Sequence, residues 1–92
     1  MIEIKFEREN KRAVAKLSNK EIGTCIYTED NDTWNIIKTN VLKEYSGKGI
    51  ARKLVNSVIK NSKKENKKVI ATCSYANKII NERKTKWKTK ER

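Results

Sequence analysis

The sequence contains no histidine and no proline, only two cysteines and only three glycines in 92 residues. Cys25 and Cys73 lie far apart and form no CxxC pair. Without histidine or paired cysteines the ligand set of a structural zinc site is missing, so the sequence predicts no metal site. Two of the three glycines, Gly47 and Gly49, fall in one short segment. Glycine is otherwise so rare that this segment stands out.

Long apolar runs are also absent. No stretch approaches the roughly 20 residues needed to cross a bilayer, and no secretory signal peptide is visible. We therefore expect a cytoplasmic protein without a membrane partner, in a reducing compartment that keeps both thiols free.

The charge is strongly unbalanced, with 23 lysines and arginines against 11 aspartates and glutamates, a formal net charge of +12. Such a charge indicates either nucleic-acid binding or a lysine-rich surface with a local anion site. Trp34 and Trp87 would be the candidate stacking platforms for nucleic acid, although we expect Trp34 in a strand. Lysine far outnumbers arginine, whereas specific base contacts favour arginine. Nucleic acid is therefore a possible partner but not the favoured one.

Apolar and polar residues alternate through the first half of the chain, which is typical of half-buried strands. The alternation predicts four strands, at residues 2–7, 13–17, 21–28 and 33–42. The connections are short, including an acidic turn at 29–32, and short connections favour an antiparallel meander.

From Gly49 the apolar spacing changes to three and four residues, which predicts an amphipathic helix to about residue 64. Residues 69–73 are a short apolar run typical of a buried parallel strand, and a second helix is expected around 75–80. The basic tail at 82–92 is expected to fray. Because a chain of this length forms one small domain, we predict a single α+β domain over 1–92. Its mixed sheet combines a four-strand antiparallel meander, a helix, a parallel strand and a C-terminal helix.

The glycine segment lies between the fourth predicted strand and the first helix. A loop of this kind leaves backbone N–H groups unpaired at the positive end of a helix dipole, which binds phosphate without a particular side chain. Lys48, Arg52 and Lys53 add positive charge beside Gly47 and Gly49. The segment therefore predicts a site for a phosphorylated cofactor.

Two familiar phosphate loops do not fit this segment. A Walker A loop has four residues between its glycines, followed by Lys-Ser/Thr. The dinucleotide fingerprint needs a third small residue where Arg52 stands, and follows the first strand of a parallel unit. What fits is the pattern Gln/Arg-x-x-Gly-x-Gly/Ala, with Ser46 at the first position, Gly49 at the fourth and Ala51 at the last.

That pattern resembles the pyrophosphate loop of the GNAT acetyltransferases, and the chain resembles their small, stand-alone members over nearly its whole length. The matching pieces are Thr39-Asn40-Val41, the segment Gly47 to Val55, and Cys73-Ser74-Tyr75. The resemblance implies acetyl-coenzyme A as cofactor, with its pyrophosphate on the backbone amides of residues 47–52. Its pantetheine arm would lie along Thr39, Asn40 and Val41, where the fourth strand separates from the fifth. The implied cofactor-binding residues around the loop are Ser46, Gly47, Lys48, Gly49, Ile50, Ala51, Arg52 and Lys53, with Cys73 at the thioester end.

Cys73 and Tyr75 are the candidate catalytic residues. Cys73 ends a predicted strand just before a helix, a position that favours the thiolate, although free cysteines are often small buried hydrophobes. Tyr75 is either a general acid for the departing thiolate of coenzyme A or a packing residue. We expect Cys25 to be a core residue.

The resemblance predicts an N-acetyltransferase that transfers acetyl to an unidentified amine of a small molecule or protein. Either the amine attacks the thioester directly, with the oxyanion held by a strand amide, or Cys73 carries the acetyl group. The alternatives are a coenzyme A-binding module with little catalysis and a basic nucleic-acid-associated protein. We expect a monomer or weak dimer.

Overall fold

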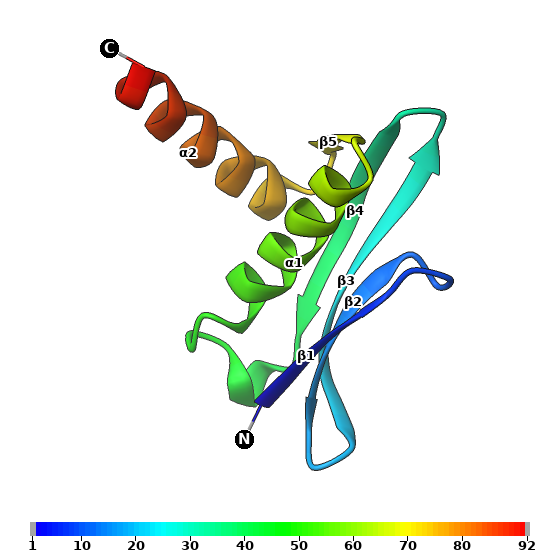
Figure 1. Ribbon diagram of the computed structural model, residues 1–92. Coiled ribbons are helices and arrows are strands. Elements are labelled where there is room, and N and C mark those ends of the chain that lie inside the picture. Colours follow the sequence, from blue (N-terminus) through cyan, green and yellow to red (C-terminus); the bar gives the residue numbers. More distant parts are fainter. Residues whose placement is uncertain (1, 92) are drawn as a thin grey trace.

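The computed structural model (Figure 1) describes the backbone of residues 2–91 and the side chains of residues 2–82. Alternating apolar residues form the strands, and the apolar stripe at three- and four-residue spacing forms the first helix, as predicted. In chain order the elements are β1 (Ile2–Glu7), β2 (Arg12–Leu17), β3 (Lys20–Asp30), β4 (Thr33–Val41), a 3-10 turn η1 (Lys43–Tyr45), α1 (Ile50–Lys64), β5 (Lys68–Ala71) and α2 (Ser74–Glu91).

The five strands form one sheet in the order β1-β2-β3-β4-β5. The first three neighbouring pairs are antiparallel, and β5 pairs with β4 in parallel after the crossover through α1. Figure 1 shows α1 lying across one face of this sheet. The predicted α+β class, the meander and the parallel fifth strand are all confirmed.

Three boundaries differ from the sequence-based prediction by two residues or more. β3 continues to Asp30, so the expected acidic turn at 29–32 shrinks to Asn31 and Asp32, with Asn31 in the left-handed region at φ 55°. β5 ends at Ala71, earlier than predicted, because α2 begins at Ser74. α2 extends to Glu91, well beyond the helix expected around 75–80, and fraying of the tail stays a prediction.

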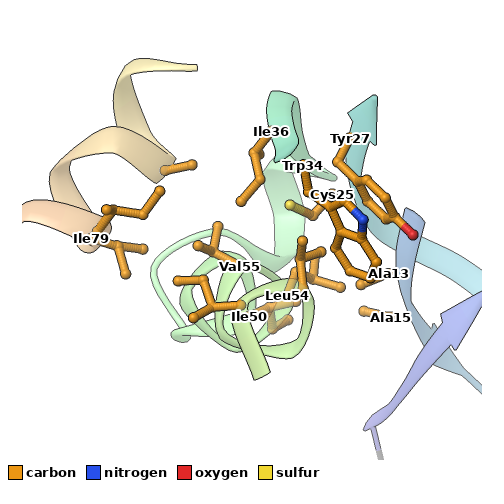
Figure 2. Close-up of a cluster of buried hydrophobic side chains, with 14 of the residues drawn as sticks. Ala13, Ala15, Cys25, Tyr27, Trp34, Ile36, Ile50, Leu54, Val55 and Ile79 are labelled. Atoms are coloured by element: carbon orange, nitrogen blue, oxygen red, sulfur yellow. The ribbon is translucent and has the colours of Figure 1, made fainter. Parts of the chain in front are cut away.

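The core lies between the sheet and α1. Figure 2 shows Leu54 and Val55 of α1 facing Cys25, Trp34 and Ile36 of the sheet, all of them buried. Such close packing explains the one glycine that lies outside the loop. A Cβ atom at Gly23 would lie 3.1 Å from Leu54 Cδ1 and 3.1 Å from the Asn40 carbonyl oxygen, so only glycine lets the helix and β4 come this near to β3.

An aromatic stack fills the opposite end of the core from the glycine loop. The rings of Tyr27 and Trp34 lie 4.3 Å apart, and Phe6 stacks on both. The Arg8 guanidinium lies 5.0 Å from the Trp34 ring centre and pairs with Glu29. Trp34 is therefore a core residue and not a stacking platform for nucleic acid, while the side chain of Trp87 lies outside the described residues.

Within residues 2–91, no helix is both long enough and apolar enough to cross a membrane. Over the same described part of the chain, histidine, cysteine, aspartate and glutamate side chains nowhere gather in a group of three or more that could hold a metal ion.

Candidate cofactor-binding site

The connection from β4 to α1 begins with a closed turn. The Ser46 backbone N–H donates to the Lys43 carbonyl at 3.1 Å, and the Ser46 hydroxyl donates to the same carbonyl at 2.8 Å. Ser46 stands where the GNAT pattern has arginine or glutamine. Its side chain completes the η1 turn instead of reaching outward.

Both glycines of the loop adopt a left-handed backbone conformation, with φ 79° at Gly47 and at Gly49, and Gly49 is the N-cap of α1. A Cβ atom at either position would meet nothing within 4 Å. The glycines are therefore required by backbone conformation rather than by protein packing, and the space beside them is open to a ligand.

Backbone N–H groups of the loop and of the first turn of α1 are left unpaired beside that space. The first helical hydrogen bond of α1 runs from the Lys53 N–H to the Gly49 carbonyl at 3.1 Å. Among the described residues, the N–H groups of 47–52 have no hydrogen-bond acceptor. The first turn of α1 also carries no acidic residue. Unpaired donors at the positive end of a helix, without a competing carboxylate, form an anion site.

The side chains around the loop divide into three groups. Ile50 is buried and Ala51 half-buried, so these two anchor the start of α1 in the core. Lys48 and Lys53 are exposed, and they add positive charge at the open side. Arg52 turns to α2, where its guanidinium pairs with the Glu82 carboxylate at 3.2 Å. Arg52 was expected to supply charge to the loop, yet part of that charge is neutralised by this partner.

β4 and β5 separate after the pair Ile36–Ala71, which follows the pair Asn35–Ile70. Their pairing ends at Ile36 and Ala71, and the Ile36 carbonyl accepts hydrogen bonds from both Thr72 N–H and Cys73 N–H, at 3.1 and 3.2 Å. The chain then enters α2, while β4 continues through residues 37–41. This edge of β4, which includes Thr39, Asn40 and Val41, has no strand partner on the side of β5 in the described chain.

A register shift coincides with the separation. Tyr27 pairs with Ile36, whereas Ile26 pairs with Lys38, so Ile37 is an extra residue in β4. The Ile37 side chain is 44% exposed. Such a bulge bends and twists the strand that carries it. The bulge therefore changes the direction of residues 37–41 at the point where β4 separates from β5.

The loop and Cys73 lie at the two ends of this free edge. Beyond the last β5 pair, the five residues 37–41 of β4 span about 17 Å toward the η1 turn, at about 3.3 Å per residue. The geometry suits a ligand with an anionic group at one end and an extended arm that reaches the end of β5.

The two cysteines meet on the Thr39 hydroxyl. Cys73 Sγ and Cys25 Sγ each lie 3.6 Å from Thr39 Oγ1. Burial alone would raise the pKa of the half-buried Cys73 thiol. Hydrogen bonds from the Ala76 and Tyr75 backbone and from Thr39 outweigh burial, so that its pKa is lowered. Burial raises the pKa of Cys25 to about 11.

Tyr75 lies in the first turn of α2, two residues after Cys73, and is 39% exposed. It is therefore not a core residue. The relation that sequence reasoning missed is the pairing of Thr39 with Cys25, which lie directly opposite each other in the antiparallel register of β3 and β4. A two-residue turn at 31–32 followed by one bulge in β4 gives this register. The turn could be predicted, but no sequence signal indicated the bulge.

Solved structures with this fold include a GCN5-like N-acetyltransferase from Staphylococcus aureus, determined in solution by NMR, with 28% identity and a TM-score of 0.69. The match covers 90% of this chain and 81% of that one. A GCN5-related N-acetyltransferase from Sphaerobacter thermophilus matches with 25% identity and a TM-score of 0.62, over 68% of this chain and 22% of that one.

A streptothricin acetyltransferase from Bacillus anthracis, solved in complex with acetyl coenzyme A, matches with 21% identity and a TM-score of 0.62. That match covers 77% of this chain and 44% of the other. The chain thus spans less than half the length of the two longer proteins. No curated protein matches it. The model of the family described as GCN5-related N-acetyl-transferase matches residues 7–89, so the chain belongs to this family.

Proposed function

We propose that the protein is an N-acetyltransferase that takes acetyl from acetyl-coenzyme A and transfers it to an amine. The observation that carries the proposal is the row of unpaired N–H groups at residues 47–52, joined by the free edge of β4 to the Cys73 thiol. Family membership supports the same activity and the same cofactor.

The residues fit this cofactor at both of its ends. The backbone amides of the loop would hold the pyrophosphate, with Lys48 and Lys53 contributing charge from the open side. Thr39, Asn40 and Val41 would offer main-chain groups to the pantetheine arm, as an edge strand does to an added strand. When bound, acetyl-coenzyme A supplies a thioester that a neutral amine can attack.

Two residues at the end of β5 would take part in the chemistry. Tyr75, on the first turn of α2, would donate a proton to the departing sulfur. Cys73, with its lowered pKa, is available as a nucleophile. If Cys73 carries the acetyl group, its sulfur forms the new thioester while coenzyme A leaves, and the amine then displaces the sulfur. In the direct route, a β4 amide stabilises the oxyanion and Cys73 only borders the site.

Titration with acetyl-coenzyme A by calorimetry, followed by a panel of amines, tests the proposal. Binding and turnover would support it, whereas binding without turnover on any amine would favour the alternative of a coenzyme A-binding module. Cys73→Ala separates the two routes. Loss of transfer together with a transient acetyl adduct on wild-type protein, detected by intact mass, would support the acetyl-cysteine route, and undiminished transfer would support direct attack.

A cytoplasmic location is part of the proposal, because both cysteines are free thiols. The acceptor would be a small-molecule or protein amine. A monomeric or weakly dimeric state remains a prediction, which sedimentation measures.

A further inference from the structure

Three side chains from different segments of the chain form a continuous hydrogen-bonded row. Cys25 lies on β3, Thr39 opposite it on β4, and Cys73 beyond the end of β5. The Cys73 thiol donates to Thr39 Oγ1 at 3.6 Å, and the Thr39 hydroxyl donates to Cys25 Sγ at 3.6 Å. No other hydroxyl among the described residues connects two sulfur atoms.

Cys25, the buried cysteine of this row, stays protonated. Cys25 is fully buried among the core side chains of α1 and the sheet, so its thiol has no access to water (Figure 2). Burial also raises its pKa to about 11, so Cys25 remains an S–H group at neutral pH. Cys73, in contrast, is half-buried at the end of the free edge of β4.

A hydroxyl carries one proton and two lone pairs, so it can serve either sulfur as donor. When Cys73 is protonated, its S–H donates to Thr39 and the Thr39 O–H donates to Cys25. When Cys73 loses its proton to water, the Thr39 O–H can turn to the Cys73 sulfur and the Cys25 S–H can donate to the Thr39 oxygen. No group of the row loses its hydrogen bond in either state, and no covalent bond other than the Cys73 S–H is broken.

We propose that Thr39 is a positioning residue for the Cys73 thiolate, with buried Cys25 as the fixed donor that lets the Thr39 hydroxyl reverse its hydrogen bond. The inference deepens the proposed function, since the sulfur that is held is the one at the acyl end of the cofactor path. It does not require the cofactor itself. The row explains why a threonine, rather than an apolar β-branched residue, stands opposite Cys25.

Within residues 2–82, whose side chains the structure describes, no charged side chain offers a simpler account of the thiolate. From α1 the neighbouring core residues are apolar, and the titratable group of β3 that interacts with Cys73 is Cys25. Lys38 precedes Thr39 in β4, so its side chain points to the other face of the sheet. On α2 the nearest titratable side chains in sequence, Tyr75 and Lys78, are exposed. The Tyr75 and Ala76 backbone groups that also bond the sulfur do not depend on Thr39.

The test is the rate of iodoacetamide alkylation of Cys73 as a function of pH, measured by intact mass and peptide mapping without cofactor. Thr39→Val keeps the shape of the side chain but removes the hydroxyl. We expect it to move the alkylation profile to higher pH and to slow the neutral-pH rate about fivefold to tenfold. Thr39→Ser should restore the wild-type profile, and Cys25→Ala should slow alkylation about twofold to threefold through loss of the fixed donor.

Thr24→Val is the matched control, because Thr24 is a half-buried strand threonine whose neighbour Cys25 points to the opposite face. It should leave the Cys73 profile unchanged. Thermal melts establish that each variant folds, and if Thr39→Val does not, the Thr39→Ser and Cys25→Ala arms still decide. A wild-type profile in Thr39→Val, or in Cys25→Ala, would overturn the inference. Failure of the proposed function would be a separate result. In that case wild-type protein would not bind coenzyme A, while the alkylation rates of the variants would still differ as expected.

Discussion

The Arg52 guanidinium pairs with the Glu82 carboxylate at 3.2 Å and thereby joins the first turn of α1 to α2. Both side chains are about half exposed, at 52% and 42%. An exposed pair of this kind adds little to stability. Its effect is local, because the Glu82 carboxylate neutralises part of the Arg52 charge beside the anion site at residues 47–52.

The first prediction concerns this pair. Glu82→Gln should release Arg52 and strengthen coenzyme A binding about twofold to threefold at low salt, because one cation becomes available to the pyrophosphate. Unfolding stability should change by less than about 0.5 kcal/mol. Calorimetry and thermal melts measure both. Weaker binding by the glutamine variant would show that Glu82 orients Arg52 productively instead of competing for it.

The second prediction tests the loop. Gly49→Val should lower coenzyme A affinity at least about tenfold, or 1.4 kcal/mol, because a β-branched residue resists φ 79° and projects into the open space beside the amides. Lys48→Ala, which keeps the backbone, should cost less than Gly49→Val. A folded Gly49→Val protein that bound as tightly as wild type would remove the phosphate assignment from this loop.

The third prediction separates the cofactor from the net charge of +12. Coenzyme A binding should persist at moderate salt, since directed amide hydrogen bonds supplement screened charges. Binding to nucleic acid should collapse between roughly 50 and 200 mM salt. Salt titrations of both ligands make the comparison, and tight, salt-resistant, sequence-selective nucleic-acid binding would promote that alternative.

The fourth prediction concerns packing at Gly23. Gly23→Ala should destabilise the fold by about 1–2 kcal/mol, because its Cβ would press on the Asn40 carbonyl, a backbone atom that cannot turn aside. The smaller entropic gain of alanine, about 0.4–1 kcal/mol, does not offset this contact. Urea unfolding measures the change. A stabilised Gly23→Ala protein would mean that β4 shifts easily at this point.

The fifth prediction concerns acid stability at the aromatic end of the core. The hydrogen bond from Arg8 holds the pKa of the Glu29 carboxyl below its ordinary value. A carboxylate with a lowered folded-state pKa stabilises the fold above its unfolded pKa, and that stabilisation is lost as pH falls through the folded value. Arg8→Gln should therefore flatten the fall of Tm between about pH 5 and pH 3. An unchanged slope would show that Glu29 does not couple to folding.

Much of this fold follows from local patterns. The change from alternation to three- and four-residue spacing at Gly49 predicts the meander and the crossover helix, because each period allows only one face to be buried. The glycine loop is equally local, since two left-handed residues at a helix start expose the same amides in any fold. The proposed cofactor site was therefore predictable as a loop and a strand.

The relations between distant residues were not predictable in this way. Cys25 lies opposite Thr39 only because Ile37 bulges out of β4. Without that extra residue the register set by the pair Tyr27–Ile36 would continue unchanged. The residues of β4 beyond Ile36 would then pair one position away from their observed partners, and their side chains would point to the opposite face of the sheet. Arg52 likewise finds Glu82 thirty residues away only once α2 has packed beside α1. Periodicity along the chain specifies which face of an element is buried, whereas strand register and helix docking depend on the packing of all elements together, and these decided which side chains meet at the sulfur of Cys73.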